Sequence, residues 1–333
     1  MKNKLDHIQK IAVFRALQLG DMMCCIPAIR SLRAAYPSAH ITLLGMPWAA
    51  SFVDRFNFYF EEFIHFPGFP GLPEQIFNRE KFALFLKHIR HEKFDLLLQM
   101  QGNGTIVNEL LLKFGAKNIA GFYTPLSVVN SPYFIPYPNH GSEISRHLLL
   151  MQHLGISSKG DQLEFPFTKK DQQGFDELLL PVIAKNYICI HPGSRGRWRQ
   201  WPPQYFALIA DHCIEQGLTV VLTGTQDESD ITREVKKCMH HAPIDLTGKT
   251  SLGALALLIK NALVLISNCT GVSHIADAVQ TPSVIISMDG EPHRWAPLNK
   301  NLHRVIDWTK EPHLEKVLLE THYLLQELLL PRS

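Results

Sequence analysis

Several features that would settle the class of this protein at once are absent from its 333 residues. No stretch reaches the roughly 18 apolar residues of a membrane-spanning helix, and the polar N-terminus does not resemble a signal peptide, so we expect a cytoplasmic protein. The six cysteines form no Cys-x-x-Cys pair and no zinc-spaced cluster with histidine, which indicates a reducing compartment. The 33 basic residues nearly balance the 31 acidic ones, so no nucleic-acid partner is expected.

Familiar nucleotide, metal and hydrolase motifs are missing as well. No Gly-x-Gly-x-x-Gly follows a strand pattern, and Gly248-Lys249-Thr250 has Pro243 where a P-loop needs its first glycine. No Asp-x-Asp occurs, which removes the commonest way of holding a metal on a sugar diphosphate, and Gly-x-Ser-x-Gly is absent. The sequence therefore gives no support to a dehydrogenase, a P-loop NTPase or a hydrolase, and no metal is expected.

The sequence does contain an alternation of short apolar runs with helical patterns. This alternation predicts an α/β fold built from βα units with parallel sheets, and the length suggests two domains. Strands are predicted at 11–14, 41–44, 95–99, 187–190, 219–222, 263–267 and 283–286. Helices are predicted at 22–35, 82–91, 204–216, 252–260, 273–279 and 312–329.

The two halves of the chain repeat this scheme. We place the domain boundary near residue 168, which gives domains of residues 1–168 and 169–333, with the apolar C-terminal helix as a candidate to pack across both. Residues 60–77 are dense in Phe, Pro and Gly and predict an irregular loop. Such a loop either plugs the edge of the sheet or forms an aromatic lid over a substrate.

Polar residues gather where predicted strands turn into helices, which is where open α/β sheets bind ligands. The first such turn runs from Arg15 to Asp21. Asp21 is a candidate helix cap, and it is equally a candidate general base, held ionised by the free N–H groups of the helix start. The residue pattern alone leaves both roles open.

The second turn runs from His191 to Pro203 and carries three arginines beside a helix start. Prolines suit the first helical positions, and the exposed N–H groups of a helix start favour an anion. Arginine side chains match phosphate oxygens in geometry, so Ser194, Arg195 and Arg199 are candidate phosphate ligands. A solvated basic loop is the simpler alternative.

A third turn, at 267–274, and the end of another strand complete the set of polar segments. The third turn joins a buried strand to a helix and offers further N–H groups for phosphate or ribose. Its candidate donor ligands are Asn268, Cys269, Thr270, Gly271 and His274. His274 is equally explained as a satisfied helix histidine, and Glu228, placed to accept from sugar hydroxyls, as a helix cap.

Taken together and in this order, the segments resemble glycosyltransferase family 9, whose best-known members are lipopolysaccharide heptosyltransferases. The resemblance runs through nearly the whole chain. It rests on Gly20-Asp21, Ile26-Pro27-Ala28, Phe94–Asn103, Ile119–Phe122, His191-Pro192-Gly193, Arg199–Pro202, Leu222–Gly224 with Glu228, Asn268–Gly271 with His274, Thr281-Pro282 and Arg294–Pro297.

The resemblance implies a GT-B fold, with two Rossmann-like domains facing each other across a cleft. The N-terminal domain would receive the acceptor, and the C-terminal domain would bind the nucleotide sugar. It also implies an inverting, metal-independent transferase with Asp21 as general base, Gly20 beside it, and Arg199 among the groups on the leaving diphosphate. ADP-heptose is the implied donor, a lipid-linked or surface-glycan acceptor the implied partner, and peripheral contact with the inner membrane a further expectation.

The chain departs from the family pattern at two positions. The family usually has Lys where Arg199 stands and Asp where Cys269 stands, which leaves the donor sugar and its nucleotide open. A non-hydrolysing nucleotide-sugar epimerase and an inactive nucleotide-sugar binder are the alternatives. Neither requires a base at Asp21, so the retained Gly20-Asp21 pair favours a transferase.

Overall fold

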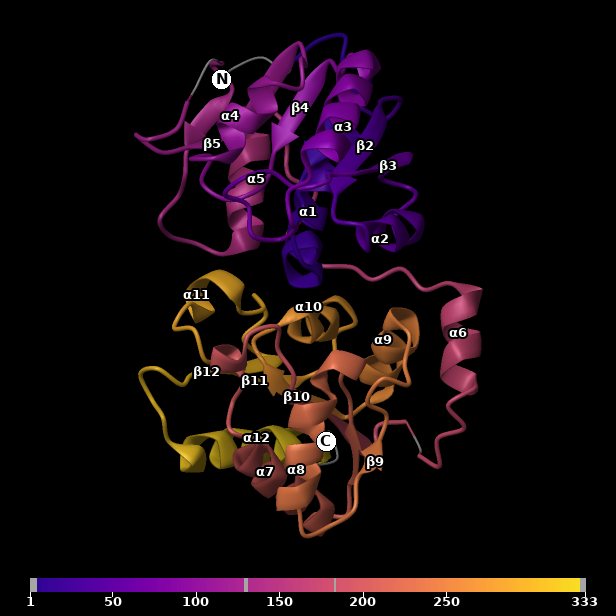
Figure 1. Ribbon diagram of the computed structural model, residues 1–333. Helices are drawn as coiled ribbons and strands as arrows, with labels where there is room; N and C mark the ends of the chain where they lie inside the picture. The colour runs from indigo at the N-terminus through magenta and orange to yellow at the C-terminus, as the bar shows by residue number, and fades with distance from the viewer. Residues whose placement is uncertain (1–4, 129–130, 183, 330–333) are drawn as a thin grey trace. The chain divides into compact units, whose positions relative to one another are not determined.

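The chain folds as two units, each with a parallel sheet covered by helices (Figure 1). The computed structural model describes residues 5–128, 131–182 and 184–329. Contacts within the chain separate residues 1–162 from residues 163–333. Residue 168, where the sequence placed the boundary, is the N-cap of the first helix of the second unit: the Thr168 hydroxyl accepts the backbone N–H of Asp171.

The described residues of the first unit form a sheet of order β3-β2-β1-β4-β5-β6. Every pairing in this sheet is parallel, and in β1 Ile11 pairs with Ile41 on one side and Leu96 on the other. The elements are β1 (Lys10–Phe14), α1 (Leu19–Ala35), β2 (His40–Gly45), α2 (Ala49–Arg55), β3 (Glu62–His65), α3 (Arg79–Glu92), β4 (Leu96–Gln99), α4 (Val107–Leu112), β5 (Asn118–Tyr123), β6 (Phe134–Pro136) and α5 (Glu143–His153).

The described part of the second unit repeats the arrangement, with a parallel sheet of order β12-β11-β10-β7-β8-β9. Two short 3₁₀ turns, at Arg197–Arg199 and Gln226–Glu228, lie in its loops. The elements are α6 (Lys169–Asp176), β7 (Tyr187–His191), α7 (Pro203–Glu215), β8 (Thr219–Leu222), α8 (Ser229–Cys238), β9 (Ile244–Asp245), α9 (Leu252–Asn261), β10 (Val264–Asn268), α10 (Gly271–Ala278), β11 (Ser283–Ser287), α11 (Pro292–Trp295), β12 (His303–Asp307) and α12 (Leu314–Leu329).

All seven strands predicted from apolar runs are present as β1, β2, β4, β7, β8, β10 and β11, so the predicted α/β fold is confirmed. Each is nearly or fully buried, because helices cover both faces of a parallel sheet. Counted within its own unit, each sheet has the Rossmann strand order 3-2-1-4-5-6. That order reverses direction between β1 and β4, and again between β7 and β10.

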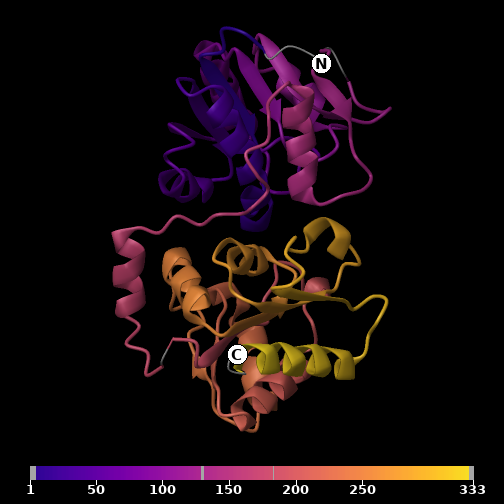
Figure 2. The same cartoon turned by 180° about the vertical axis from the view of Figure 1, so that it is seen from behind.

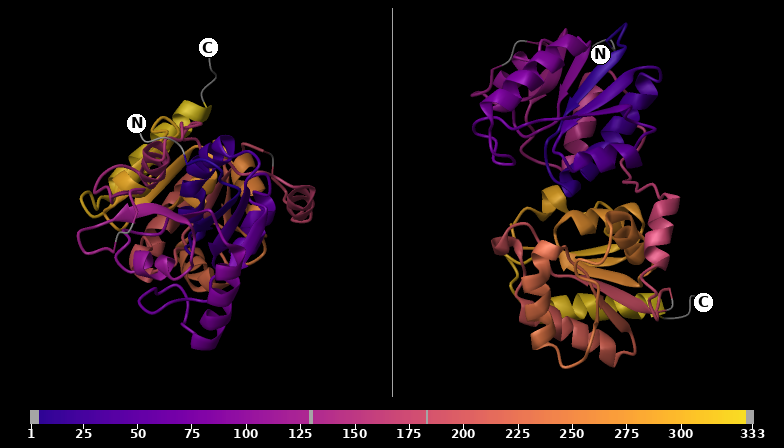
Figure 3. Two further views of the ribbon diagram at one scale, coloured as in Figure 1. Left: turned by 90° about the horizontal axis from the view of Figure 1, so that it is seen from above. Right: turned by 45° about the vertical axis from the view of Figure 1, so that its right-hand side comes forward.

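Each sheet packs its helices through apolar side chains. In the first unit, Phe14 of β1 belongs to one core cluster with Phe85 of α3 and Leu110 of α4. In the second, Ile188 of β7 packs in a cluster that includes residues of α7 and α12. Figure 3 shows the second sheet between this helix layer and the layer of α9 and α10.

Two sequence expectations need revision or remain open. Residues 62–65, predicted as part of an irregular loop, form β3, because they pair with β2 at the sheet edge. Phe66 follows as a core residue against Phe14 at 4.9 Å between ring centroids, and only the remainder of the loop is irregular. Helix α12 packs against α7 and β11 of its own unit (Figure 2); its packing across both domains stays a prediction.

Candidate active site at two switch points

The predicted polar turns lie where ligands bind in Rossmann sheets. The turn at 15–21 follows β1, the turn at 191–203 follows β7, and the turn at 267–274 follows β10. These strands flank the points where strand order reverses. Open α/β sheets bind ligands at such points, outside the carboxyl ends of the strands, so the topology gives each unit one candidate site.

Asp21 lies in the first turn of α1. The helix begins at Leu19, earlier than the predicted Met22, so Gly20 and Asp21 are both helical. Asp21 Oδ2 accepts the backbone N–H of the N-cap residue Gln18 at 3.3 Å, so Asp21 is the third residue of a capping box and not the cap of a helix that starts near Met22. The side chain keeps 24% of its surface exposed, so the cap fixes the carboxylate without removing it from solvent.

A buried ionic network lies behind Asp21, and the sequence analysis did not identify it. The fully buried Arg15 donates from Nε to the Asp21 carbonyl at 2.8 Å, and its Nη2 lies 3.8 Å from Asp21 Oδ1. The same Nη2 pairs with Glu143 at 3.2 Å, and Nη1 donates to the carbonyl of Met100. The only sequence signal for this network was an arginine at the end of an apolar strand.

The buried carboxylate of Glu143 joins α5 to this network. It also pairs with Arg146 at 3.3 Å and with His147 at 3.4 Å. Burial opposes the charged form of Arg15, but the negative charges around it, first of all Glu143 and also Asp21, outweigh burial and raise its pKa. Arg15 is thus a permanent cation whose Nη2 lies 3.8 Å from the Asp21 carboxylate.

In the second unit, Arg199 ends the 3₁₀ turn between β7 and α7. Its Nη2 pairs with Asp289, in the loop after β11, and its guanidinium lies 5.5 Å from the centre of the Trp198 ring. The Arg199 side chain remains 32% exposed, whereas Asp289 is almost buried. Asp289 was missed from the sequence because a lone aspartate far along the chain carries no local signal.

The remaining predicted residues of this turn differ in exposure. Ser194 is buried, and its carbonyl accepts the side chain of Gln200 at 2.9 Å, whereas Arg195 is exposed. Pro203 occupies the first position of α7, as predicted, so its missing N–H leaves no helical hydrogen bond unmade. The start of α7 itself offers an anion little, because Pro202 and Pro203 have no N–H and the N–H of Tyr205 already donates to the Pro202 carbonyl at 3.0 Å.

Glu228 is held against the first residue of the same turn. Its Oε2 accepts the backbone N–H of Thr225 at 2.8 Å and lies 3.5 Å from His191 Nε2. Burial raises the pKa of this carboxyl, but the contacts with His191 and Thr225 outweigh burial and lower it to about 2. Gly193 is required here, because a Cβ would lie 2.2 Å from Glu228 Cδ.

Asn268 connects the turns that follow β7 and β10. Its Oδ1 accepts the Trp201 N–H at 2.9 Å, and its Nδ2 donates to the carbonyls of Pro192 at 2.7 Å and Gly193 at 3.3 Å. The side chain is fully buried. As placed, Asn268 shapes the backbone around the candidate site, and a direct contact with a ligand stays a prediction.

Helix α10 begins directly after Cys269. Thr270 is its N-cap and Gly271 its first residue; the N–H of Ser273 donates to the Thr270 carbonyl at 3.0 Å, and the N–H groups of Gly271 and Val272 have no acceptor within the helix. Burial raises the pKa of the Cys269 thiol to about 12, so this residue is neutral at physiological pH. His274 is buried one turn further along α10. This helix start can hold an anion.

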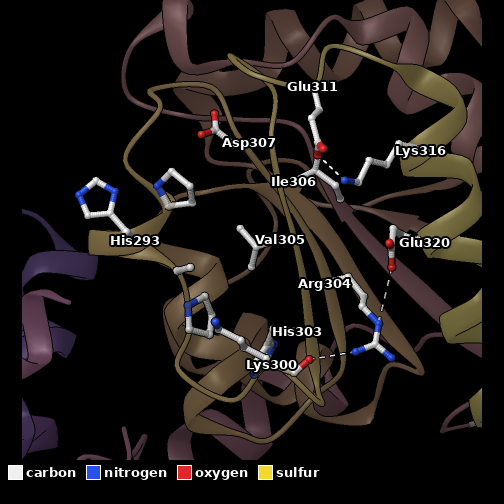
Figure 4. Close-up of a pocket in the computed structure, with 13 residues that line it drawn as sticks. His293, Lys300, His303, Arg304, Val305, Ile306, Asp307, Glu311, Lys316 and Glu320 are labelled. Carbon is white, nitrogen blue, oxygen red and sulfur yellow. Dashed lines mark hydrogen bonds and ion pairs between the residues drawn. The ribbon is translucent and has the colours of Figure 1, made fainter. Parts of the chain in front are cut away.

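A separate hollow of about 460 Å³ lies along the edge strand β12 (Figure 4). Four of its charged residues pair with one another: Lys316 with Glu311, and Arg304 with Glu320 at 3.7 Å. None of the predicted donor ligands lines it. We therefore do not place the donor there.

Two further observations concern metals and membranes. In residues 5–128, 131–182 and 184–329, no three His, Cys, Asp or Glu side chains are grouped so that they could hold a metal ion. No helix in this part of the chain is long and apolar enough to cross a membrane.

Two Rossmann-like units in one chain are the fold called GT-B, and solved structures of glycosyltransferases have the same fold. A glycosyl transferase of family 9 from Veillonella parvula superposes with a TM-score of 0.77 at 20% identity, covering 97% of this chain and 99% of that one. Escherichia coli heptosyltransferase WaaC, solved with ADP-2-deoxy-2-fluoro heptose, gives a TM-score of 0.69 at 15% identity over 96% of this chain and 99% of its own.

The sequence places the protein more narrowly. The family described as glycosyltransferase family 9 (heptosyltransferase) matches residues 82–324, and the chain belongs to this family. Lipopolysaccharide heptosyltransferase 3 of Escherichia coli is 26% identical over 300 residues, which cover 85% of this chain and 84% of that protein. The protein is therefore a glycosyltransferase, and the resemblance drawn from its motifs is confirmed.

Proposed function

We propose that this enzyme transfers heptose from ADP-heptose, with inversion, to a hydroxyl of a lipopolysaccharide-core or related surface-glycan acceptor. The family supports glycosyl transfer, and the WaaC structure was solved with an analogue of ADP-heptose. The observation that carries the proposal is the anchored, partly exposed carboxylate of Asp21 at the switch point of the first unit. Asp21 precedes the family match at 82–324, so its role rests on this geometry and on the Gly20-Asp21 motif.

The proposed reaction is a direct displacement at the anomeric carbon. Asp21 takes the proton of the acceptor hydroxyl as the new glycosidic bond forms, and the bond from the anomeric carbon to the diphosphate breaks with both electrons leaving on ADP. Arg199, Ser194 and the first N–H groups of α10 then face the charge that builds on the leaving diphosphate. Glu228 and Thr270 are proposed donor contacts, and no metal takes part.

The same proposal assigns the acceptor to the first unit and the donor to the second. A lipid-linked acceptor implies contact with the inner membrane face. Two observations support the first unit for this contact: Ile76 is 96% exposed and Leu84 on α3 is 70% exposed, with basic Lys81 and Lys87 on the same helix. Flotation with anionic vesicles tests this contact, and equal recovery with and without vesicles would contradict it.

The decisive experiment compares Asp21→Asn with the unaltered enzyme in a transfer assay with ADP-heptose and a heptose-deficient lipopolysaccharide acceptor. Asparagine keeps an oxygen for the Gln18 N–H but cannot accept the proton, so turnover falls at least roughly a hundredfold. ADP affinity, measured by calorimetry, changes less than about threefold. Assays with and without EDTA test the proposed independence of metals.

The chain offers a matched control for this variant. Asp171 occupies the same capping-box position in α6, where its Oδ2 accepts the N–H of Thr168 at 2.8 Å. Asp171→Asn weakens a helix cap without touching the proposed site, and turnover is retained. Equal activity of Asp21→Asn and the unaltered enzyme would refute the base. Donor turnover without an acceptor would instead favour an epimerase, and ADP binding without turnover an inactive binder.

A further inference from the structure

Arg199 forms an ion pair with Asp289, and the proposed role of Arg199 at the diphosphate does not account for this contact. It joins two loops that follow different strands: Arg199 lies after β7, and Asp289 after β11. A single residue in a left-handed conformation, Gly290 with φ +70°, follows Asp289 and turns the loop toward α11. The aspartate is therefore brought to the arginine by a turn that a residue with a side chain would strain.

Asp289 is itself rigidly held. Its Oδ1 accepts the hydroxyl of Ser287 at 2.9 Å and the backbone N–H of Glu291 at 3.2 Å, which leaves Oδ2 for Arg199. Its side chain is 7% exposed, against 32% for Arg199. The carboxylate is thus a fixed point within the loop, and the guanidinium is the partner that meets solvent.

The pair leaves Arg199 able to bind another anion. A guanidinium has five N–H donors, and the contact with Asp289 runs through Nη2. Arginine can therefore hold a carboxylate on one edge and phosphate oxygens on another. Cys269, the residue directly after β10, supplies no charge because its thiol is protonated, so the carboxylate that balances Arg199 is that of Asp289.

We infer that Asp289 is a positioning residue, which orients Arg199 toward the leaving diphosphate of the nucleotide-sugar donor. This rests on the proposed function and assigns a role to a residue in the loop after β11. Without Asp289, the long arginine side chain samples other rotamers and must be ordered by each incoming ligand, which costs affinity. It is also misaligned with the charge of the transition state, which costs turnover.

A double-mutant cycle of Asp289→Asn and Arg199→Gln tests the inference on two readouts, kcat with ADP-heptose and ADP affinity by calorimetry. With Arg199 present, we expect Asp289→Asn to lower kcat at least tenfold and to weaken ADP about three- to tenfold. With Gln at 199, the same change alters either quantity less than twofold, because the residue acts through Arg199.

Two further variants serve as a charge-retaining substitution and as a control. Asp289→Glu retains the charge and recovers part of the kcat lost in Asp289→Asn, which serves if the asparagine variant folds poorly. Asp230→Asn removes an exposed carboxylate of α8 that pairs with Arg233, and leaves both readouts unchanged. Thermal melting of each variant, followed by circular dichroism, verifies that the fold is retained.

Three results would overturn the inference: independent, additive losses in the double variant, unchanged kcat in Asp289→Asn, or tighter ADP binding by Asp289→Asn. The last would mean that Asp289 competes with the diphosphate for Arg199. Failure of the proposed function is distinguishable, because it shows as no heptose transfer by the unaltered enzyme, while the ADP cycle still decides the role of Asp289. No ADP binding by the unaltered enzyme would overturn both.

Discussion

The two units have the same strand order, yet the arginine at the switch point is buried in one unit and partly exposed in the other. After β1, Arg15 is fully buried among the carbonyl of Met100, Asp21 and the carboxylate of Glu143. After β7, Arg199 pairs with one carboxylate and keeps about a third of its surface in solvent. At the same topological position, the first unit has a cation that is buried and the second has one that solvent and ligands can reach.

This difference follows from what each cation can do physically. A charge removed from water must be paired permanently, because an unpaired buried charge is very costly. Arg15 is therefore suited to fix a neighbouring group, Asp21, and not to bind a substrate. A partly exposed arginine exchanges water for a ligand at low cost, so Arg199 is suited to meet a diphosphate.

We expect the largest effect from Glu143→Ala, which leaves Arg15 of the first unit buried without its main partner. The free energy of unfolding of the first unit is expected to fall by about 3–5 kcal/mol. Denaturant titration followed by circular dichroism measures this loss. The control is Glu109→Ala, which removes an exposed carboxylate of α4 and changes stability by about 0.5 kcal/mol or less. A loss below about 1 kcal/mol in Glu143→Ala would show that the pair is not tightly coupled to folding.

Glu228→Gln probes the carboxylate of the second unit through pH. The pKa of Glu228 in the folded protein, about 2, lies below the ordinary value of 4.5 for this side chain, so ionised Glu228 stabilises the fold above about pH 4.5 and this contribution is lost as pH falls toward 2. The variant is expected to be about 2 kcal/mol less stable than the unaltered protein at pH 7. Urea titrations at pH 7, 4.5 and 3 should show this difference shrinking with acid; a constant difference would argue against the pKa shift.

The smallest expected effect distinguishes two of the three arginines in the turn that follows β7. Arg199→Ala weakens ADP about tenfold, the loss of one charge-assisted contact. Arg195→Ala weakens it less than threefold, because the exposed side chain of Arg195 makes a contact screened by solvent. Isothermal calorimetry of both variants at one salt concentration measures the contrast. Similar losses would place Arg195 beside the diphosphate with Arg199.

The strands and the turns were predictable because their signals are local. Apolar runs of four or five residues marked β1 and β7, and Pro203 marked the start of α7. Asp21 does make a local capping contact, but with the N–H of Gln18 in a helix that begins at Leu19 and not, as predicted, near Met22. Edge strand β3 was missed because it is short, only partly buried and set in a segment rich in Phe, Pro and Gly.

The partners of the site were not predictable in this way. Glu143 lies 128 residues from Arg15, and Asp289 lies 90 residues from Arg199. Neither carboxylate belongs to a motif, and each reaches its arginine only because the sheet order brings distant loops to one edge. The burial that distinguishes the two arginines is likewise a property of the packed chain.

By itself, the sequence determined the repeated βα pattern, the polar turns at strand ends and the family. These depend on residue types and short spacings, which a linear chain displays directly. Only the tertiary structure decided which charged side chains are buried and which remain exposed to solvent. That outcome depends on long-range pairing and on solvent access, and both arise only when parallel strands from distant parts of the chain share a sheet.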